Sequence, residues 1–398
     1  MTAGQPAPSG LAGLAVSYLA ASTAGGVGQH VLMLASGCAG RGAAVTVYGP
    51  AALGRRAARD AGAGAGPPGP PGWRFVPMEI AGRPRPASDT AAVLRLRRLL
   101  ARDRPGVLHA HGVRAGAVAA LALAGTRATA LVVTVHNAAP PGRAAAATYT
   151  GLELIVARRA DAVLAVSGDL AARLRHRGAR DVTRAIVPAP AAAPPSAADV
   201  AAVRRELGIA GPAAPPVVLA AGRLAAQKDF GTLLLAAARW RRRDPVPLLV
   251  IAGDGPQAAA LRGQAAADGV AARFLGYRQD VPALLAAADV VVVPSRWEGQ
   301  PLIVQEALRA GRPLVASQVG GVPELTGGDG AVLVPPRDPA ALAAAVTRLL
   351  DDPAAAAAQA AAARARAAQL PAAADAVDQA AALYQRLVRT TRPTRAAR

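Results

Sequence analysis

The 398-residue chain is poor in cysteine, in aromatic residues and in long apolar runs. Its single cysteine, Cys38, excludes an internal disulfide and fits a reducing compartment. No apolar run reaches the roughly 20 residues that a membrane-spanning helix needs. The first residues also lack the basic segment that is typical of a signal peptide. These absences predict a cytoplasmic protein without a membrane-spanning segment.

Aromatic residues make up only 3% of the chain, although its net charge is +20. So large a charge indicates a polyanionic partner or an anionic surface. The aromatics are too few for a platform that stacks bases, and no nucleic-acid-binding signature is present. Arginine clusters are instead dispersed along the chain, at Arg95–Arg104, Arg239–Arg243 and Arg389–Arg398. We interpret them first as a solvated surface and second as peripheral contact with an anionic membrane, and we expect no nucleic acid.

Short apolar runs alternate with amphipathic stretches of helical length, which is the pattern of a parallel α/β sheet. The first half contains strand candidates at Leu14–Tyr18, Ala43–Val47, Arg74–Val76, Gly106–His109, Ala130–Val135, Ala162–Val166 and Arg184–Val187. The second half contains them at Val217–Ala221, Leu248–Ala252, Ala272–Leu275, Val290–Val293, Leu314–Ala316 and Ala331–Val334. The pattern predicts two successive doubly wound sheets, with ligands in a cleft at the carboxyl ends of the strands.

A Pro/Ala-rich stretch near Pro188–Ala193 interrupts this rhythm and predicts the linker between the domains. We therefore expect a first domain at residues 1–190 and a second at residues 191–372. Residues 373–398 would form a C-terminal helix, Ala373–Arg389, and a basic tail. A helix is also expected at Ala197–Leu207, and a loop at Ala61–Gly72.

Lysine is the scarcest of the charged residues, because all 45 cationic side chains except Lys228 are arginine. Gly222, Arg223 and Lys228 follow the strand candidate that ends at Ala221, so they lie on a loop at the carboxyl edge of the sheet. A compact ammonium and a planar guanidinium interact differently with phosphate. Together the two cations indicate a diphosphate site; alternatively, the loop is a solvated charged turn.

A second loop follows the strand Val290–Val293, in Pro294-Ser295-Arg296-Trp297-Glu298-Gly299-Gln300-Pro301-Leu302. Pro301 fits the first turn of a helix, which would leave Gly299 and Gln300 at a helix N-terminus that favours phosphate. Glu298 precedes this helix, and Glu306 lies about one and a half turns into it. Carboxylates there suit sugar or ribose hydroxyls. The alternative is a structural cluster in which these acids pair with the two cations.

Further turns come at strand ends throughout the chain. Gly253-Asp254-Gly255-Pro256, Gly276-Tyr277-Arg278 and Gly320-Gly321-Val322-Pro323-Glu324 would line the same edge of the second sheet. In the first half, Gly26 and Gly28 open a helix and would let a backbone approach a phosphate or sugar. His109-Ala110-His111 and His136 also end strands. Alternation would place His109 and His111 on one side of the sheet, with His111 nearer the exposed end, and we favour a functional role for His111.

These motifs, taken in order, resemble the retaining glycosyltransferases of family 4, which have the GT-B fold of two Rossmann-like domains facing a cleft. The resemblance extends over nearly the whole chain. It depends most on Gly222-Arg223-Leu224 with Lys228, Gly253-Asp254-Gly255-Pro256, Gly276-Tyr277, the Glu-x7-Glu motif Glu298–Glu306, and Gly320-Gly321-Val322-Pro323-Glu324. It implies transfer of a sugar from a UDP- or GDP-sugar to an acceptor that the sequence does not identify. The composition associates the protein with the cell envelope or with polysaccharide biosynthesis, and the basic clusters suggest a lipid-linked acceptor.

The resemblance also implies roles for individual residues. Arg223 and Lys228 would neutralise the donor diphosphate, and Glu306 would hold the ribose. Glu298 would hold the donor sugar and phosphate. The backbone amides of the segment Gly299–Leu302, in which Pro301 itself has no N–H, would help it. The segment Gly276–Arg278, with Tyr277 at its centre, would meet the base. Gly26 and Gly28 would approach the donor, and His111 would contact the donor sugar. No catalytic metal and no other cofactor is expected.

Two departures from the family's pattern bear on activity. Val187-Pro188-Ala189-Pro190 stands where relatives carry an Asn-Gly turn, and Gln300 replaces a common aromatic residue. Two other functions are therefore considered. A non-catalytic protein of decayed GT-B fold would not need Arg223, Lys228, Glu298 and Glu306, and a nucleotide-sugar epimerase would need more acids opposite the donor.

Overall fold

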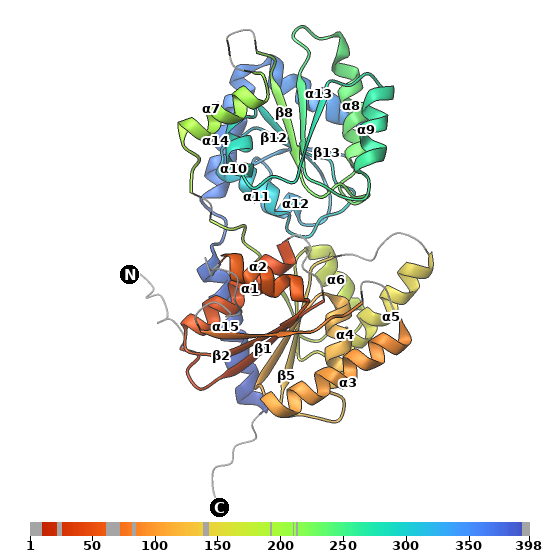
Figure 1. Cartoon of the computed structure of the whole chain (residues 1–398), viewed down its shortest axis with the longest axis vertical. Coiled ribbons are helices and arrows are strands. Elements are labelled where there is room, and N and C mark those ends of the chain that lie inside the picture. Colours follow the sequence, from red (N-terminus) through yellow and green to blue (C-terminus); the bar gives the residue numbers. More distant parts are fainter. Residues whose placement is uncertain are drawn as a thin grey trace, which may run out of the picture. The chain divides into compact units, whose positions relative to one another are not determined.

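The protein folds as two compact α/β units, seen in a computed structural model (Figure 1). The structure describes residues 10–21, 26–60, 72–81, 85–137, 143–191, 193–209, 211 and 214–391. One unit comprises residues up to Pro188 together with the segment from Pro371 onward, and the other comprises Ala189–Leu370. The expected boundaries, after residues 190 and 372, each lie two residues from these. The expected loop at 61–71 and the tail beyond residue 391 lie outside the described residues.

The N-terminal unit is built on a seven-stranded sheet in the order β3-β2-β1-β4-β5-β6-β7, with parallel pairing throughout. The strands are β1 (Ala15–Ala20), β2 (Ala44–Gly49), β3 (Trp73–Pro77), β4 (Val107–His111), β5 (Ala130–Val135), β6 (Ala162–Ala165) and β7 (Val182–Arg184). Their apolar runs are almost continuous because helices cover both faces of the sheet.

The helices of this unit form two layers around the sheet (Figure 1). They are α1 (Gly26–Gly40), α2 (Ala51–Asp60), α3 (Pro86–Asp103), α4 (Val113–Ala122), α5 (Arg143–Arg159), α6 (Gly168–His176) and α15 (Ala373–Thr391). Helices α1 and α15 pack on each other and on one face, whereas α3, α4 and α5 pack together on the other. Gly116 of α4 lies so close to Val133 of β5 that a Cβ would approach it to 2.7 Å.

The C-terminal unit repeats the plan with six parallel strands in the order β10-β9-β8-β11-β12-β13. The strands are β8 (Val217–Ala221), β9 (Leu248–Ala252), β10 (Ala272–Gly276), β11 (Val290–Val293), β12 (Leu314–Ser317) and β13 (Val332–Val334). The helices are α7 (Ala197–Glu206), α8 (Phe230–Ala237), the 3-10 helix η1 (Ala238–Arg242), α9 (Ala258–Ala267), α10 (Val281–Ala287), α11 (Leu302–Arg309), α12 (Val322–Thr326), α13 (Pro339–Asp351) and α14 (Pro353–Ala367).

Strand alternation divides the core of this unit into two layers. Val217 and Leu219 of β8 face one cluster, which α7, α10, α11 and α14 complete. Val218 and Ala220 face the other cluster, which α8, η1, α9 and α13 complete. Every second residue of a strand thus enters the same layer, and this fixes the register in which the strands pair.

All thirteen expected strands are present, and the expected doubly wound architecture is confirmed. The main difference is β7, which covers Val182–Arg184 instead of Arg184–Val187. Directly beyond it, the Ala185 amide still donates to the Ala165 carbonyl of β6 at 2.9 Å, and the backbone then leaves the sheet. The Ile186 amide donates to the Gln379 side chain of α15 at 3.0 Å.

In both sheets the strand order reverses at one point. Strands β2 and β3 extend to one side of β1 while β4 extends to the other, and β8 separates β9 from β11 in the same way. In open α/β sheets, ligands bind outside the carboxyl ends of the strands at such a switch point. The loops after β1, β4, β8 and β11 are therefore the places to look for a site.

No helix among the described residues is long and apolar enough to cross a membrane.

We predict that Tyr384→Phe destabilises the protein, because this hydroxyl fastens α15 to the N-terminal sheet. The Tyr384 Oη lies 2.5 Å from Nδ1 of buried His109. Its removal leaves a buried ring nitrogen unpaired, which costs about 1–3 kcal/mol. Thermal melting should show a Tm lowered by several degrees. Tyr277→Phe is the control, since that ring is 76% exposed; equal Tm values for the two variants would contradict the assignment.

Candidate functional site

The carboxyl edge of the C-terminal sheet joins the sequence motifs into one continuous surface. The Gly253 amide donates to the Gly276 carbonyl at 2.7 Å, and the Gly222 amide donates to the carbonyl at the end of β9 at 2.9 Å. On the other side, the Gly321 amide approaches the Glu298 carbonyl at 3.2 Å. The motifs that follow five different strands therefore lie on one edge, as expected.

Two glycines permit these loops to approach so closely. Gly253 has φ of +139°, and a Cβ there would lie 1.9 Å from the Gly222 carbonyl oxygen. Gly320 has φ of +50°, and a Cβ there would lie 1.9 Å from the Glu298 carbonyl oxygen. Both positions need a left-handed backbone and an absent side chain, which only glycine provides without strain.

Lys228 and Glu298 form a partly buried ion pair between the loops after β8 and β11. Lys228 Nζ donates to Glu298 Oε1 at 2.5 Å, and buried Ser295 donates to the same oxygen at 2.6 Å. The Glu298 side chain is only 5% exposed. Removing one partner of such a pair leaves an uncompensated charge and costs about 3–5 kcal/mol. The expected alternative, a structural cluster of both acids with both cations, therefore holds for Lys228 and Glu298. Glu306 and Arg223 take no part in this ion pair.

A second contact joins the same two loops. The Arg296 guanidinium donates to the buried Asp229 carboxylate at 3.0 Å, and this bond raises the pKa of Arg296. The backbone amide of Arg296 also donates to the Gln227 carbonyl at 2.8 Å. The two loops that flank the switch point are consequently held to each other by side chains and by backbone.

Arg223 differs from Lys228 in its surroundings. Its side chain is exposed, and no hydrogen bond or ion pair of it is found among the described residues. An exposed guanidinium beside the partly buried Lys228–Glu298 pair is available to an anion from solvent, and its planar fork suits phosphate oxygens.

Helix α11 begins at Leu302 with Pro301 as its N-cap, so Pro301 precedes the helix instead of lying in its first turn as expected. The dihedral ψ of +121° at Pro301 explains the difference, because it is extended and not helical. Gly299 and Pro301 are buried, while Gln300 and Leu302 are partly exposed. The helix still directs its positive end toward the edge that carries Lys228.

Glu306 is the unpaired acid of this edge. Its carboxylate has no hydrogen bond or salt bridge among the described residues, and it is half-buried. Burial raises the pKa of Glu306, and the charge of Arg309 only partly opposes this effect. A half-buried acceptor without a partner is suited to hydroxyl groups of a ligand.

The neighbours of Glu306 on α11 hold the start of the C-terminal unit. Gln305 Oε1 accepts from the Ala189 amide at 2.8 Å, and Arg309 donates to the Ala189 carbonyl at 2.8 Å. Ala189 lies in the segment Val187–Pro190 that departs from the family's pattern, and it is 3% exposed. Side chains of α11 therefore fix this segment without an Asn-Gly turn.

The turn after β10 presents Tyr277 to solvent. Gly276 has φ of +68°, and the following ring is exposed. Arg278 turns away, because it binds Glu206 through both terminal nitrogens at 2.6 and 2.9 Å and also contacts Asp280. Within this turn, Tyr277 is thus the side chain open to a flat ligand such as a base.

The histidines of the N-terminal unit lie at the other switch point. His109 and His111 share one face, with ring centres 4.3 Å apart, as alternation predicts. His111 ends β4, but it is 1% exposed, so the expected exposure at the strand end is wrong. The cause is α1, whose His30 packs edge-on against the His111 ring. Sequence reasoning missed His30, although its position two residues after Gly28 was a signal.

Gly26 and Gly28 belong to the first turn of α1. Gly26 is its first residue and partly exposed, whereas Gly28 is buried. The two residues before them in the motif, Ala24 and Gly25, lie outside the described residues.

Family models match both halves of the chain. The model described as Glycosyltransferase Family 4 matches residues 24–189, and the model described as Glycosyl transferases group 1 matches residues 215–352. The two matched segments correspond to the N-terminal and C-terminal sheets.

Curated relatives agree in class. D-inositol 3-phosphate glycosyltransferase of Salinispora arenicola is 35% identical over 66% of this chain and 65% of its own length. Alpha-D-kanosaminyltransferase of Streptomyces kanamyceticus is 36% identical over 43% of this chain and 46% of its own. Glycogen synthase of Mycobacterium tuberculosis is 42% identical over 35% of each chain. Less than two thirds of these relatives' length is matched.

Solved structures show the same fold at low identity. Anabaena HepE in complex with UDP and glucose has a TM-score of 0.77 at 22% identity, with 94% of this chain and 100% of that chain covered. Sucrose-phosphate synthase from Thermosynechococcus elongatus has a TM-score of 0.76 at 23% identity, with 95% and 100% covered. Two Rossmann-like units and family models matched to both halves lead to one conclusion: the chain belongs to glycosyltransferase family 4, the group 1 glycosyl transferases, and has the GT-B fold.

Proposed function

We propose that the protein is a retaining glycosyltransferase that takes a sugar from a nucleoside diphosphate sugar, UDP- or GDP-linked. The observation that carries this proposal is the edge of the C-terminal sheet, where an exposed cation, a lysine–carboxylate pair and an unpaired carboxylate meet at a switch point. Arg223 and Lys228 supply positive charge for the diphosphate, and Glu306 supplies an acceptor for the ribose hydroxyls.

In the proposed reaction the bond between C1 of the sugar and the diphosphate oxygen breaks. A bond from C1 to an acceptor oxygen forms on the same face, and the acceptor proton passes to the departing phosphate. Negative charge grows on the diphosphate as it leaves, so fixed cations stabilise the transition state more than the ground state. Lys228 is already held in place by Glu298 and Ser295, which limits the reorganisation that the step requires.

Glu298 has two roles in this proposal. Its carboxylate orients Lys228, and its carbonyl approaches the amide of Gly321, so the loop that would surround the donor sugar is fixed by both. Relatives commonly carry an aromatic residue two positions after this glutamate, whereas this chain has Gln300 there. We therefore expect a donor sugar that is held by polar contacts.

We predict that one nucleoside diphosphate stabilises the protein in a thermal-shift titration with UDP, GDP, ADP and their common sugar conjugates, without added metal. UDP is the first probe, because HepE, which shares the fold, was solved with it. The free energy of unfolding increases with the ratio of ligand concentration to Kd, by about 2.7 kcal/mol when the ligand concentration is a hundred times Kd. Glu306→Ala should abolish the shift. Asp329→Ala, an exposed acid just before β13 at the opposite edge, should retain it.

The variant Glu306→Gln adds a pH dependence to this test. The pKa of Glu306 is raised in the folded protein. Without ligand, the protonated carboxyl therefore stabilises the folded state at pH values below its ordinary pKa. This stabilisation is lost as the pH rises through the raised pKa. Wild-type stability relative to Glu306→Gln should then fall with rising pH, while nucleotide affinity should rise. If no nucleotide shifts the Tm, or if both Glu306 variants show the same shift as the wild type, the protein is instead a non-catalytic scaffold.

We predict that Lys228→Arg lowers turnover by about 100-fold or more although the charge is retained, since a loss of this size follows removal of one fixed transition-state donor. The flat guanidinium of arginine cannot take the place of the compact ammonium between Glu298 and the diphosphate. The measurement is release of the nucleoside diphosphate from the conjugate that the thermal shift identifies. Arg242→Lys, on an exposed part of η1, is the matched control. Turnover like that of the wild type in Lys228→Arg would show that the lone lysine is incidental.

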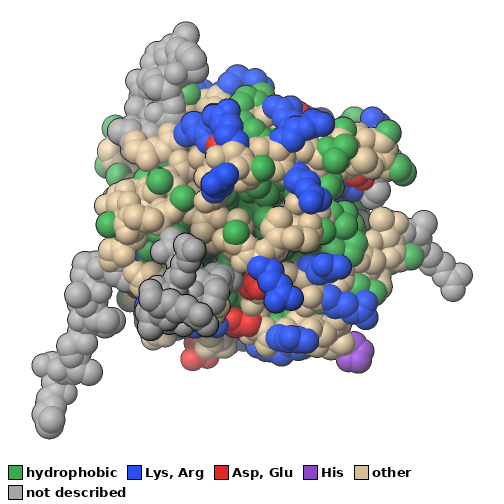
Figure 2. Space-filling view, turned by 90° about the horizontal axis from the view of Figure 1, so that it is seen from below, with side chains coloured by type: hydrophobic (Ala, Val, Ile, Leu, Met, Phe, Trp, Pro, Cys, Tyr) green, Lys and Arg blue, Asp and Glu red, His purple; other side chains and the backbone are tan. Residues whose placement is uncertain are grey.

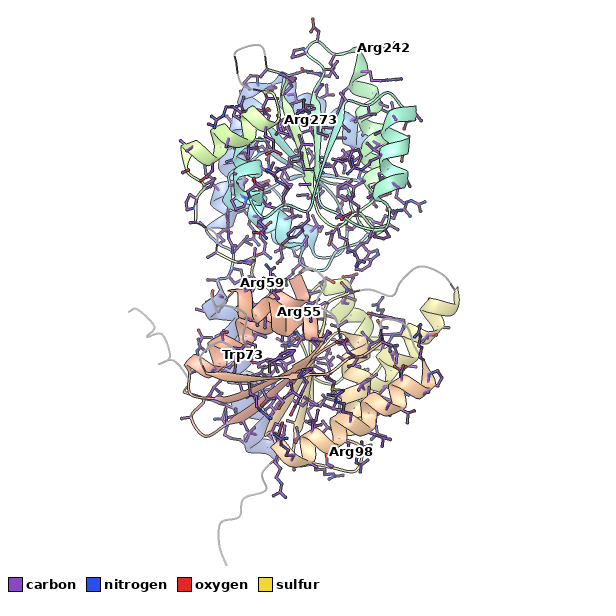
Figure 3. All side chains as sticks on the ribbon, viewed as in Figure 1. Arg55, Arg59, Trp73, Arg98, Arg242 and Arg273 are labelled. Atoms are coloured by element: carbon purple, nitrogen blue, oxygen red, sulfur yellow. The ribbon has the colours of Figure 1, made fainter. Side chains whose placement is uncertain are left out.

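We also propose peripheral contact of the N-terminal unit with anionic membrane, which would bring a lipid-linked acceptor close. Arginine side chains spread over the face in Figure 2, with fewer acidic ones among them. Helix α3 presents exposed Arg97 and Arg98 together with Leu94, which is 47% exposed. Arg98 extends outward from its unit, as Arg242 does from the other (Figure 3).

Sedimentation with anionic liposomes at low salt should recover the protein in the pellet. Replacing Arg97 and Arg98 together by serine should weaken binding about tenfold or more, at about 1 kcal/mol for each arginine near the surface. The same double change at Arg241 and Arg242 on η1 is the control and should have little effect. Failure of the wild type to sediment with the liposomes, or equal losses in both pairs, would count against a membrane contact through α3.

A further inference from the structure

Three buried histidines converge at the switch point of the N-terminal sheet. His30 comes from α1, His111 ends β4, and His136 follows β5. Their exposed fractions are 4%, 1% and 7%. One nitrogen from each ring can be chosen so that the three atoms lie within 4.8 Å of one another. The cluster forms only when the chain folds, because its members are separated by many residues and belong to different elements.

The ring nitrogens of this cluster are incompletely paired. His30 Nδ1 and His111 Nε2 are both buried without a hydrogen-bond partner among the described residues. An unpaired buried nitrogen costs free energy, so two in one cluster need an explanation. His109 offers a contrast, because its two nitrogens contact the hydroxyls of Tyr384 and Thr134 at 2.5 and 2.7 Å.

We propose that His30, His111 and His136 bind one divalent transition-metal ion, with Zn²⁺ as the best fit. Three imidazoles on a tetrahedral Zn²⁺, each with Zn–N of about 2.0–2.1 Å, place their ring centres about 5.1–5.3 Å apart. The observed ring centres form a nearly equilateral triangle with sides of 5.4, 5.5 and 5.4 Å. Imidazole nitrogen is also a ligand that Zn²⁺ prefers.

The nitrogen positions are consistent with this arrangement. His111 Nδ1 lies 3.1 Å from His136 Nε2, close to the separation of about 3.3 Å between two ligand atoms of one tetrahedral Zn²⁺. His30 Nδ1 is the third candidate ligand, because it is buried and has no hydrogen-bond partner among the described residues. A metal would replace the contact between the two histidines with two coordinate bonds. It would give His30 Nδ1 a partner, while His111 Nε2 would stay unpaired.

An outer hydrogen bond already orients His30. Its other ring nitrogen donates to the carbonyl of Ile186. Histidines that bind metals commonly donate their second nitrogen to a carbonyl or carboxylate, which fixes the tautomer and the ring.

Three protein ligands leave a fourth position of a tetrahedral ion open. Water or an oxygen of a bound molecule can fill it, and the ion would hold α1 to β4 and β5. This site lies within the N-terminal unit, so it does not depend on the proposed donor chemistry of the C-terminal unit. It would add a resident metal to a chain for which the sequence predicts none.

The test is metal binding by the whole protein, purified without a polyhistidine tag and stripped with a chelator. Equilibrium dialysis against Zn²⁺ followed by elemental analysis should give one equivalent. Co²⁺ in its place should show the visible absorption of a tetrahedral ion. At a hundredfold excess of Zn²⁺ over Kd, the Tm should rise by about 3–6 °C.

Single variants separate the site from non-specific binding. His30→Asn and His136→Asn should lose the equivalent of metal and the Co²⁺ spectrum, while circular dichroism and cooperative melting show that they remain folded. His176→Ala, which removes the exposed histidine of α6, should retain both. Absence of stoichiometric metal in the wild type, or its equal retention in His30→Asn and His136→Asn, would overturn the proposal.

Discussion

The candidate site depends on the ion pair between Lys228 and Glu298, which joins the loops on either side of the second switch point. The carboxylate is buried, and Ser295 binds the same carboxylate oxygen as Lys228, so both loops are fixed before any ligand arrives. Close backbone approaches at Gly253 and Gly320 extend this fixed surface to the neighbouring strands. A preorganised edge of this kind limits the reorganisation that binding and catalysis require.

Much of the fold could be predicted because parallel strands buried on both faces read as apolar runs. Val217–Ala221 and Val290–Val293 have the same bounds in sequence and structure. The convergence of the motifs on one edge was also predictable, since the carboxyl ends of parallel strands meet there. β7 was misplaced because a contact with Gln379, nearly 200 residues later, decides where the backbone leaves the sheet.

The contacts of individual side chains could not be read from the sequence. Both Glu298 and Glu306 follow β11, but only packing decides that Glu298 pairs with Lys228 and that Glu306 stays unpaired. Likewise, His111 was placed correctly on its strand, while its burial depends on His30 of α1. Spacing along the chain predicts which edge a residue occupies, and three-dimensional packing determines what it contacts.

The near-complete replacement of lysine by arginine has a chemical consequence. The ε-amino group of Lys228 is the only side-chain amine of the printed sequence, and it lies at the candidate site with its side chain 19% exposed. Reagents that acylate amines therefore have a single side-chain address in this protein, and a lysine-specific protease has a single bond to cleave. The composition that leaves this surface so basic also makes its candidate site chemically unique.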